Sequence, residues 1–179
     1  MSSSVEFLIS LTSLDLIDCK ILCFFQKLLD RINLSGCSKF NKLLEDLGNI
    51  TSLKVIDLSA TAIKELPSSI EFLIGLTSLD LTDCKNFVLL PSTICSLKSL
   101  YKIYLSGCSK FVNLLENLEN LKDLHKLFLS ETTIEVLPSS IGCLTTLKKL
   151  CLRDCKKLVC LPSTFCSLKM VQYLNITRC

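Results

Sequence analysis

A leucine pattern that recurs at nearly regular intervals along the whole chain constrains the fold more than any other feature of the sequence. The pattern reads L-x-x-L-x-L-x-x-(C/T), and it returns at almost constant spacing except between the first two copies, which lie closer together. One unit of this size cannot bury its own apolar face, so such repeats indicate a stack of similar units that share a continuous core. The eight copies begin at Leu11, Leu29, Leu53, Leu76, Leu100, Leu124, Leu147 and Val171.

A longer period, equal to three of the short repeats, is superimposed on the short one. The heptapeptide at residues 34–40 returns unchanged at residues 105–111, and the pentapeptide at 66–70 returns at 137–141. Because both segments return after the same number of repeats, this similarity indicates duplication of a three-repeat block.

Each repeat begins with the alternation of a short strand. In the segment Leu76–Leu81, we expect Leu79 and Leu81 to point into the core, while Ser78 and Asp80 point outward. The residues that follow place an apolar side chain at about every third position, and they must turn the chain back to begin the next strand. The leucines are therefore expected to form the scaffold rather than a site, since each buried leucine contributes roughly 1.5–3 kcal/mol.

We therefore expect an α/β solenoid, a right-handed superhelix in which every repeat adds one short parallel strand to the concave face. Loops, 3-10 turns or short helices are expected on the convex face. Residues 1–179 are expected to form one domain of about eight repeats, truncated at both ends because the chain begins and ends in mid-repeat. One repeat, near residues 20–30, is irregular and shorter than the others.

The composition excludes several classes of function. Leucine supplies 39 of the 179 residues, yet the longest apolar run is the five residues Ile21–Phe25, whereas a membrane span needs about 20. The net charge of +3 is too small to indicate nucleic acid binding, and a single histidine disfavours His-rich metal sites. We expect no membrane, nucleic acid, metal or cofactor partner.

The 12 cysteines are expected to be free thiols of a reducing compartment rather than a disulfide framework. The N-terminus lacks the basic and apolar regions of a signal peptide, and no C-x-x-C pair is present. Cys151 is a candidate reactive thiol because its strand position faces outward, although no histidine flanks it. The strand-end position, where a small side chain is expected to turn inward and satisfy backbone groups, holds Cys19, Cys37, Thr61, Cys84, Cys108, Thr132, Cys155 and Cys179.

The complete unit, seen at residues 147–168, adds the convex pattern (L/I/F)-x-x-L-P-x-x-(I/F)-x-x-L. With the phrases Leu-Ser-Gly-Cys-Ser-Lys, Leu-Pro-Ser-Ser-Ile and Leu-Arg-Asp-Cys-Lys-Lys-Leu, it resembles the leucine-rich repeats of plant TIR-type nucleotide-binding leucine-rich-repeat disease-resistance receptors. The resemblance implies a cytoplasmic protein, with the nucleus as a further location. The sequence contains neither a TIR domain nor the P-loop G-x-x-x-x-G-K-(S/T) of that family.

Function in such a solenoid is expected on the exposed strand face, where side chains of adjacent strands form columns. The central outward column is expected to hold Asp15, Asn33, Asp57, Asp80, Tyr104, Phe128, Cys151 and Asn175. The preceding outward column is expected to hold Ser13, Arg31, Val55, Ser78, Lys102, Lys126, Lys149 and Tyr173.

Charge divides these outward strand positions into two halves. The first four repeats carry six acids and two bases, for a net charge of −4, and the last four carry six bases and two acids, for +4. Exposed aromatic groups among basic residues favour protein binding, whereas a solvated face of splayed lysines is the alternative. The candidate binding residues are Tyr101, Lys102, Tyr104, His125, Lys126, Phe128, Lys148, Lys149, Arg153, Tyr173 and Arg178.

By resemblance, we expect a protein-recognition module of plant innate immunity that senses a pathogen effector or a guarded host protein and regulates an intracellular receptor. Other domains of the parent receptor are expected as further partners. A general intracellular scaffold for signalling proteins such as small GTPases is the alternative, because repeats of that kind share the L-P-x-x-I pattern. An enzyme is not expected, since the sequence has no nucleophile–base pair, metal-ligand spacing or phosphate loop.

Overall fold

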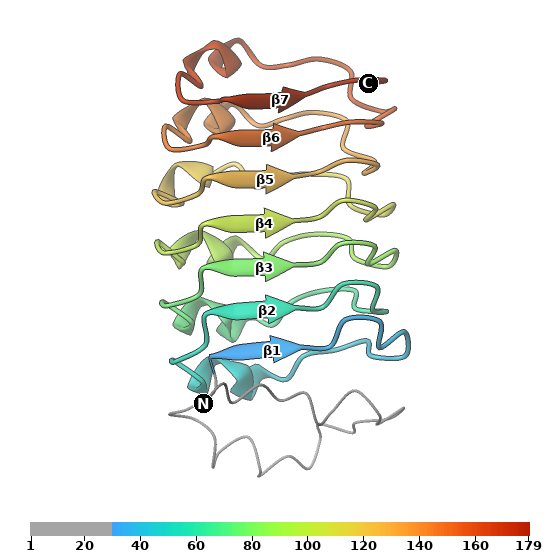
Figure 1. The fold of residues 1–179 in the computed structure, drawn as a ribbon, viewed down its shortest axis with the longest axis vertical. Coiled ribbons are helices and arrows are strands. Elements are labelled where there is room, and N and C mark those ends of the chain that lie inside the picture. The colour runs from blue at the N-terminus through green and yellow to red at the C-terminus, as the bar shows by residue number, and fades with distance from the viewer. Residues whose placement is uncertain (1–29) are drawn as a thin grey trace.

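The computed structural model describes residues 30–179, which form one continuous stack of repeats (Figure 1). The first repeat, which starts at Leu11, lies outside the described residues, together with all but the end of the short repeat near residues 20–30. The predicted outward residues Ser13 and Asp15 and the strand-end Cys19 lie outside them as well. The other predicted repeats each contribute one strand to the stack.

Seven three-residue strands pair in sequence order as one parallel sheet, β1 to β7, without a crossover. Neighbouring strands pair residue for residue, so every repeat holds the same place relative to the next. The predicted leucine-rich-repeat solenoid with one short parallel strand per repeat is confirmed. The strands are β1 Arg31–Asn33, β2 Val55–Asp57, β3 Ser78–Asp80, β4 Lys102–Tyr104, β5 Lys126–Phe128, β6 Lys149–Cys151 and β7 Tyr173–Asn175.

Short 3-10 helices cover the side opposite the strands, and no α-helix occurs within residues 30–179. A proline precedes four of them, for example Pro67 with φ −65° and Pro138 with φ −66°. The fixed φ of proline suits an extended residue before a helical turn, which explains the L-P-x-x-I pattern. The helices are η3 Glu45–Asn49, η4 Ser68–Phe72, η5 Ser92–Ser96, η6 Leu118–Asn120, η7 Ser139–Cys143 and η8 Ser163–Ser167.

The core lies between the strands and the 3-10 helices and continues from one repeat to the next. Leu79 and Leu81 are fully buried, as the alternation predicts, and Ser78 and Asp80 are half-buried on the outer face. Phe87 and Phe111 stack inside the core with ring centroids 6.0 Å apart. The repeats are therefore held together by apolar contacts across every repeat boundary.

The strand-end cysteines and threonines satisfy backbone carbonyl groups inside the stack. Thr61 Oγ1 donates a hydrogen bond to the Leu58 carbonyl of its own repeat at 2.7 Å, and Cys84 Sγ donates to the same carbonyl from the following repeat at 3.0 Å. Cys108 donates likewise to Leu81 at 3.0 Å. Burial raises the pKa of the Cys108 thiol to about 12, so it stays a protonated donor. The predicted structural role is confirmed at these positions.

The third residue after every strand has a positive φ, which L side chains adopt at a cost. Gly36 has φ +77° and Gly107 has φ +76°, whereas Ala60 adopts φ 56°. The glycines of the Leu-Ser-Gly-Cys phrase therefore occupy the position where glycine is favoured. The remaining repeats place Asp83, Glu131, Asp154 and Arg178 in this conformation.

Because of this backbone geometry, we expect Gly36→Ala to lower the free energy of unfolding by about 1 kcal/mol. No atom lies within 4 Å of the added Cβ, so backbone strain is the only cause. Ala60→Gly at the equivalent position should raise the same quantity. Gly75→Ala, where φ is not positive and the nearest atoms to the Cβ are 3.7 and 3.8 Å away, is the control and should not destabilise. Urea denaturation measures the free energy of unfolding of all three variants. Equal losses of stability in Gly36→Ala and Gly75→Ala would contradict the assignment of backbone strain to position 36.

Candidate functional site

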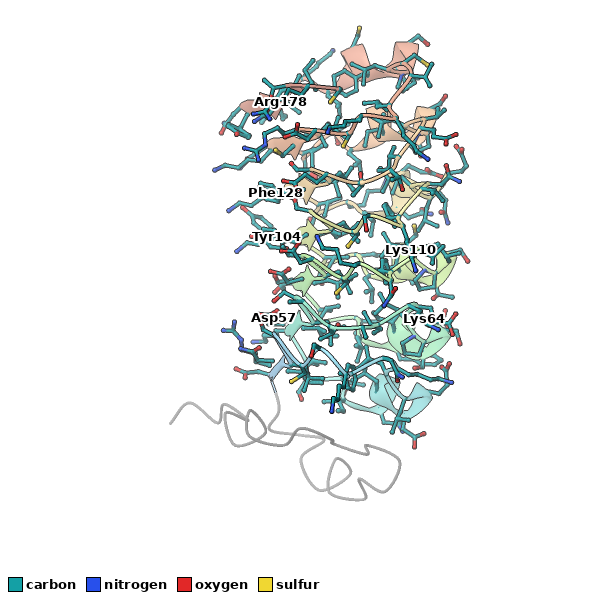
Figure 2. All side chains as sticks on the ribbon, turned by 90° about the vertical axis from the view of Figure 1, so that its right-hand side faces the viewer. Asp57, Lys64, Tyr104, Lys110, Phe128 and Arg178 are labelled. Carbon is teal, nitrogen blue, oxygen red and sulfur yellow. The ribbon has the colours of Figure 1, made fainter. Side chains whose placement is uncertain are left out.

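The candidate site is the strand face, the side of the sheet formed by outward-pointing strand residues. Strand pairing places side chains in the two predicted columns. Over the described repeats, the first column holds Arg31, Val55, Ser78, Lys102, Lys126, Lys149 and Tyr173. The second column holds Asn33, Asp57, Asp80, Tyr104, Phe128, Cys151 and Asn175. Figure 2 shows this face in profile, with Asp57, Tyr104, Phe128 and Arg178 on one edge and Lys64 and Lys110 on the opposite edge.

Two pairs of aromatic rings stack on this face between β4 and β5. The rings of Tyr104 and Phe128 lie almost parallel, at 6°, with centroids 4.9 Å apart. The rings of Tyr101 and His125, which immediately precede the two strands, lie 4.3 Å apart at 21°. His125 is fixed further by a contact of 2.7 Å between its Nδ1 and the Asp123 carbonyl oxygen. The two stacks form preorganised flat surfaces on neighbouring repeats.

Partial burial, with Asp80 nearby as a second cause, raises the pKa of the Tyr104 phenol. The group is therefore neutral and able to donate a hydrogen bond at physiological pH. An aromatic body with a polar tip suits a contact surface, because it offers apolar area and directional bonding together.

A ladder of three lysines runs between the two aromatic stacks. We call Lys102, Lys126 and Lys149, which pair in register on β4, β5 and β6, the lysine ladder. Adjacent strands lie about 4.8 Å apart, so the ladder concentrates positive charge. Within residues 30–179, no ladder lysine has an acidic side chain within 4.0 Å. Lys102 Nζ lies 5.8 Å from the centroid of the Tyr101 ring, within the range of a cation–π contact.

A groove of about 660 Å³ continues from the ladder toward β1. Over the described residues it follows the first column from Lys102 on β4 to Arg31 on β1, so it runs across the strands. The sequence did not predict this hollow, because it is formed by side chains of several repeats and exists only once the repeats are stacked. Its lining consists of Arg31, Val55, Thr77, Ser78, Ser99, Tyr101, Lys102, Asp123 and His125.

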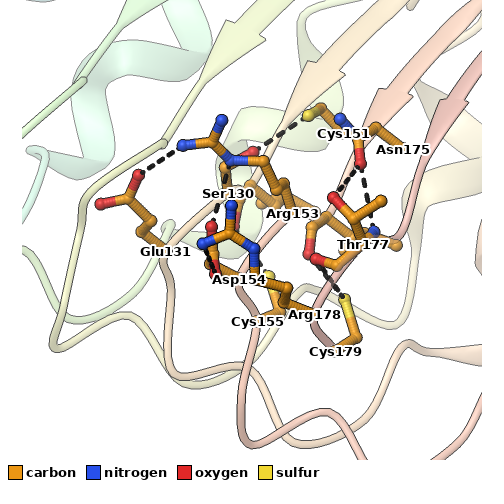
Figure 3. A network of polar contacts seen from close by, with 12 residues as sticks. Ser130, Glu131, Cys151, Arg153, Asp154, Cys155, Asn175, Thr177, Arg178 and Cys179 are labelled. Atoms are coloured by element: carbon orange, nitrogen blue, oxygen red, sulfur yellow. Dashed lines mark hydrogen bonds and ion pairs between the residues drawn. The ribbon is translucent and has the colours of Figure 1, made fainter.

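The two arginines of the predicted basic patch differ from the ladder lysines. Arg153 contacts Glu131 at 3.5 Å and Asp154 at 3.1 Å, and Arg178 reaches Asp154 at 3.5 Å (Figure 3). These acids stand on the turns that follow the strands. The charges of Arg153 and Arg178 are therefore largely compensated within the chain, whereas the ladder lysines form no ion pair within residues 30–179.

Most acids and amides of the second column have a structural role that the sequence interpretation missed. Asp57 Oδ1 accepts hydrogen bonds from the Ser59 backbone N–H at 3.1 Å and from its hydroxyl at 2.7 Å. Asp80 accepts from the Thr82 N–H at 2.9 Å. These bonds close the turn after the strand. The spacing Asp/Asn-x-Ser/Thr is the signal that could have revealed it, and Asn33 and Asn175 repeat it.

Cys151, the candidate reactive thiol of the sequence, is buried rather than accessible. Its backbone occupies an outward position, as predicted, but the side chain is only 9% exposed. The small thiol lies between the larger Phe128 and Asn175 of the adjacent strands, and its Sγ is 3.0 Å from Ser130 Oγ. A reagent in solvent therefore has little access to it.

The described residues hold no group of three or more His, Cys, Asp or Glu side chains that is arranged to bind a metal ion. In the same part of the chain, no helix is long and apolar enough to cross a membrane.

Since like charges on paired strands repel, we expect Lys126→Glu to stabilise the chain. The new carboxylate would lie between Lys102 and Lys149, and the free energy of unfolding should rise by about 0.5 kcal/mol. The gain should shrink in high salt because the charges are exposed to solvent. Lys122→Glu, an exposed site in the loop before β5, is the matched control. Urea denaturation checks the pair, and a loss of stability specific to Lys126→Glu would contradict the repulsion.

Comparisons with known proteins agree with the stack of repeats. The model of the family described as "Leucine-rich repeat region" matches residues 10–131. TMV resistance protein N of Nicotiana glutinosa is 44% identical over 63 residues, which are 35% of this chain and 6% of that protein. Disease resistance protein RPP2A of Arabidopsis thaliana is 37% identical over 90 residues, 48% of this chain and 7% of that protein. The chain therefore spans only a small part of these relatives.

Among solved structures, the plant peptide hormone receptor RGFR1 in complex with RGF2 superimposes with a TM-score of 0.61 and 25% identity. The similarity covers 80% of this chain and 27% of the receptor. The chain belongs to the leucine-rich repeat family, as a repeat region similar to those of plant disease resistance proteins.

Proposed function

We propose that this chain is a protein-recognition module of a plant immune receptor and that its strand face contacts the ligand. The observation that carries the proposal is the lysine ladder, uncompensated within the described residues, between two aromatic stacks. Aromatic and basic groups grouped at the centre of an exposed surface are the usual anchors of protein–protein binding.

Local stability does not account for this surface. In several repeats the second-column residue closes the following turn, as Asp57 and Asp80 do, whereas Tyr104 and Phe128 stack on each other instead. The ladder adds like-charge repulsion between paired strands. The ladder therefore costs stability where it stands, which supports selection of its lysines for binding.

The ligand would be a pathogen effector, a guarded host protein or another domain of the parent receptor, and recognition would take place in the cytoplasm. The two relatives named as resistance proteins support this role. The module would act by binding and not by catalysis, since Cys151, the thiol at an outward strand position within residues 30–179, is buried.

Photo-crosslinking tests the surface assignment directly. Phe128 is replaced by p-benzoylphenylalanine in the full chain, which is then irradiated in extracts of infected plant tissue. We expect covalent capture of a discrete protein, because the ring lies within the proposed contact.

The control replaces Lys64 with the same group, since Lys64 is exposed on the opposite edge of the stack (Figure 2). Capture that is equally strong from both positions, or from Lys64 alone, would refute the strand face as the recognition surface.

A further inference from the structure

We propose that the ligand segment read by the strand face is an α-helix with an acidic stripe, lying along the stack and crossing the strands. The proposal rests on the function proposed above and specifies the shape and charge of the partner. It follows from the direction of the first column, from the spacing of the lysine ladder at its β4 to β6 end and from the aromatic groups beside the ladder.

The direction comes from the first column. The groove runs along this column from Arg31 on β1 to Lys102 on β4, and the ladder continues the column to Lys149 on β6. In Figure 1 the strands that carry this column, β1 to β6, are stacked along the vertical axis, so the column crosses them. An elongated occupant aligned with the column contacts several repeats, whereas one aligned with a strand contacts the three residues of one strand.

The spacing selects a helix. Three ladder lysines on adjacent strands repeat about every 4.8 Å, so the outer two are about 9.6 Å apart. A helix repeats one face every 5.4 Å, so acids on three successive turns extend over about 10.8 Å. In an extended segment, alternate side chains repeat about every 6.7 Å and extend over about 13 Å. The span of the helical acids thus differs from that of the ladder by about 1 Å, which flexible lysine side chains can absorb. The same side chains align poorly with the longer span of an extended segment.

The flanking rings fit the two sides of such a helix. Tyr101 and His125 immediately precede the ladder lysines of β4 and β5, and Tyr104 and Phe128 follow them by two residues. A helix seated on the ladder would therefore have an aromatic stack on either side of its acidic stripe. Apolar side chains next to the stripe would contact these rings, so the expected partner is amphipathic, with apolar residues bordering its acids.

Binding of two designed peptides to the full chain tests the proposal by fluorescence anisotropy. Both have about 18 residues and the same composition of Glu, Leu and Ala, and the helical conformation of the first is enforced by a side-chain staple. In the first, glutamates recur at three- and four-residue intervals on one helical face. In the second, glutamates alternate for an extended chain. We expect the helical peptide to bind about tenfold more tightly or better.

Variants then test the ladder. Replacing Lys102, Lys126 and Lys149 together by Glu should weaken helical-peptide binding by about tenfold or more. The same change at three exposed lysines outside the strands should alter it by less than about twofold. The triple Lys→Gln variant of the ladder repeats the test without charge reversal. The comparison of the two peptides uses the unchanged chain, so it tests the proposal even if the variants fail to fold. The control lysines are Lys98, Lys122 and Lys169.

Several outcomes would overturn the proposal: equal affinity for the two peptides, no binding of either, tighter binding of a single-stranded oligonucleotide, or affinity that is insensitive to the ladder variants. If Phe128 crosslinks a protein but the helical peptide does not bind, the helical ligand is wrong and the recognition face stands. If Phe128 captures nothing beyond the Lys64 control, the recognition face itself is wrong.

Discussion

Burial of apolar side chains between neighbouring repeats is the interaction on which the rest of this structure depends. Each strand has three residues, and its inward side chains, such as Leu79 and the following Leu81, are covered only because another repeat lies on either side. The same stacking forces strands into residue-for-residue register. A set of lysines one repeat apart in sequence therefore becomes a ladder in space. The surface proposed for binding is thus a consequence of how the core is packed.

The backbone bonds that complete each repeat divide the polar residues into two groups. Strand-end hydroxyl and thiol groups donate to buried carbonyls, as Thr61 and Cys84 do at Leu58. Asp57, Asp80 and the arginine-bound Asp154 are used to close or brace turns. After these roles are assigned, the conspicuous groups that remain on the strand face are the ladder lysines, which form no ion pair within residues 30–179, and the stacked rings beside them. This separation makes them the best candidates for function.

The repeat pattern was enough to predict the solenoid, the inward leucines and the membership of both outward columns, because strand alternation and a fixed period determine them. Burial of Cys151 between larger neighbours, pairing of Arg153 with Glu131 and the groove at Arg31 could not be predicted in the same way. These features depend on the sizes of side chains in neighbouring repeats and on how far a side chain extends from one repeat to the next. The turn-closing role of Asp57 could have been predicted from the Asp-x-Ser spacing of the local sequence, whereas the charge of Asp57 alone does not indicate it.

Lysine acetylation footprinting by mass spectrometry tests the central claim most directly, because it measures the accessibility of each amine with and without the bound ligand protein. The account predicts that Lys102, Lys126 and Lys149 lose reactivity together in the complex, since all three lie under the ligand. Lys98 and Lys169, which are exposed outside the strands, should react as before. Unchanged labelling of the ladder with protection elsewhere would contradict the strand face as the binding surface.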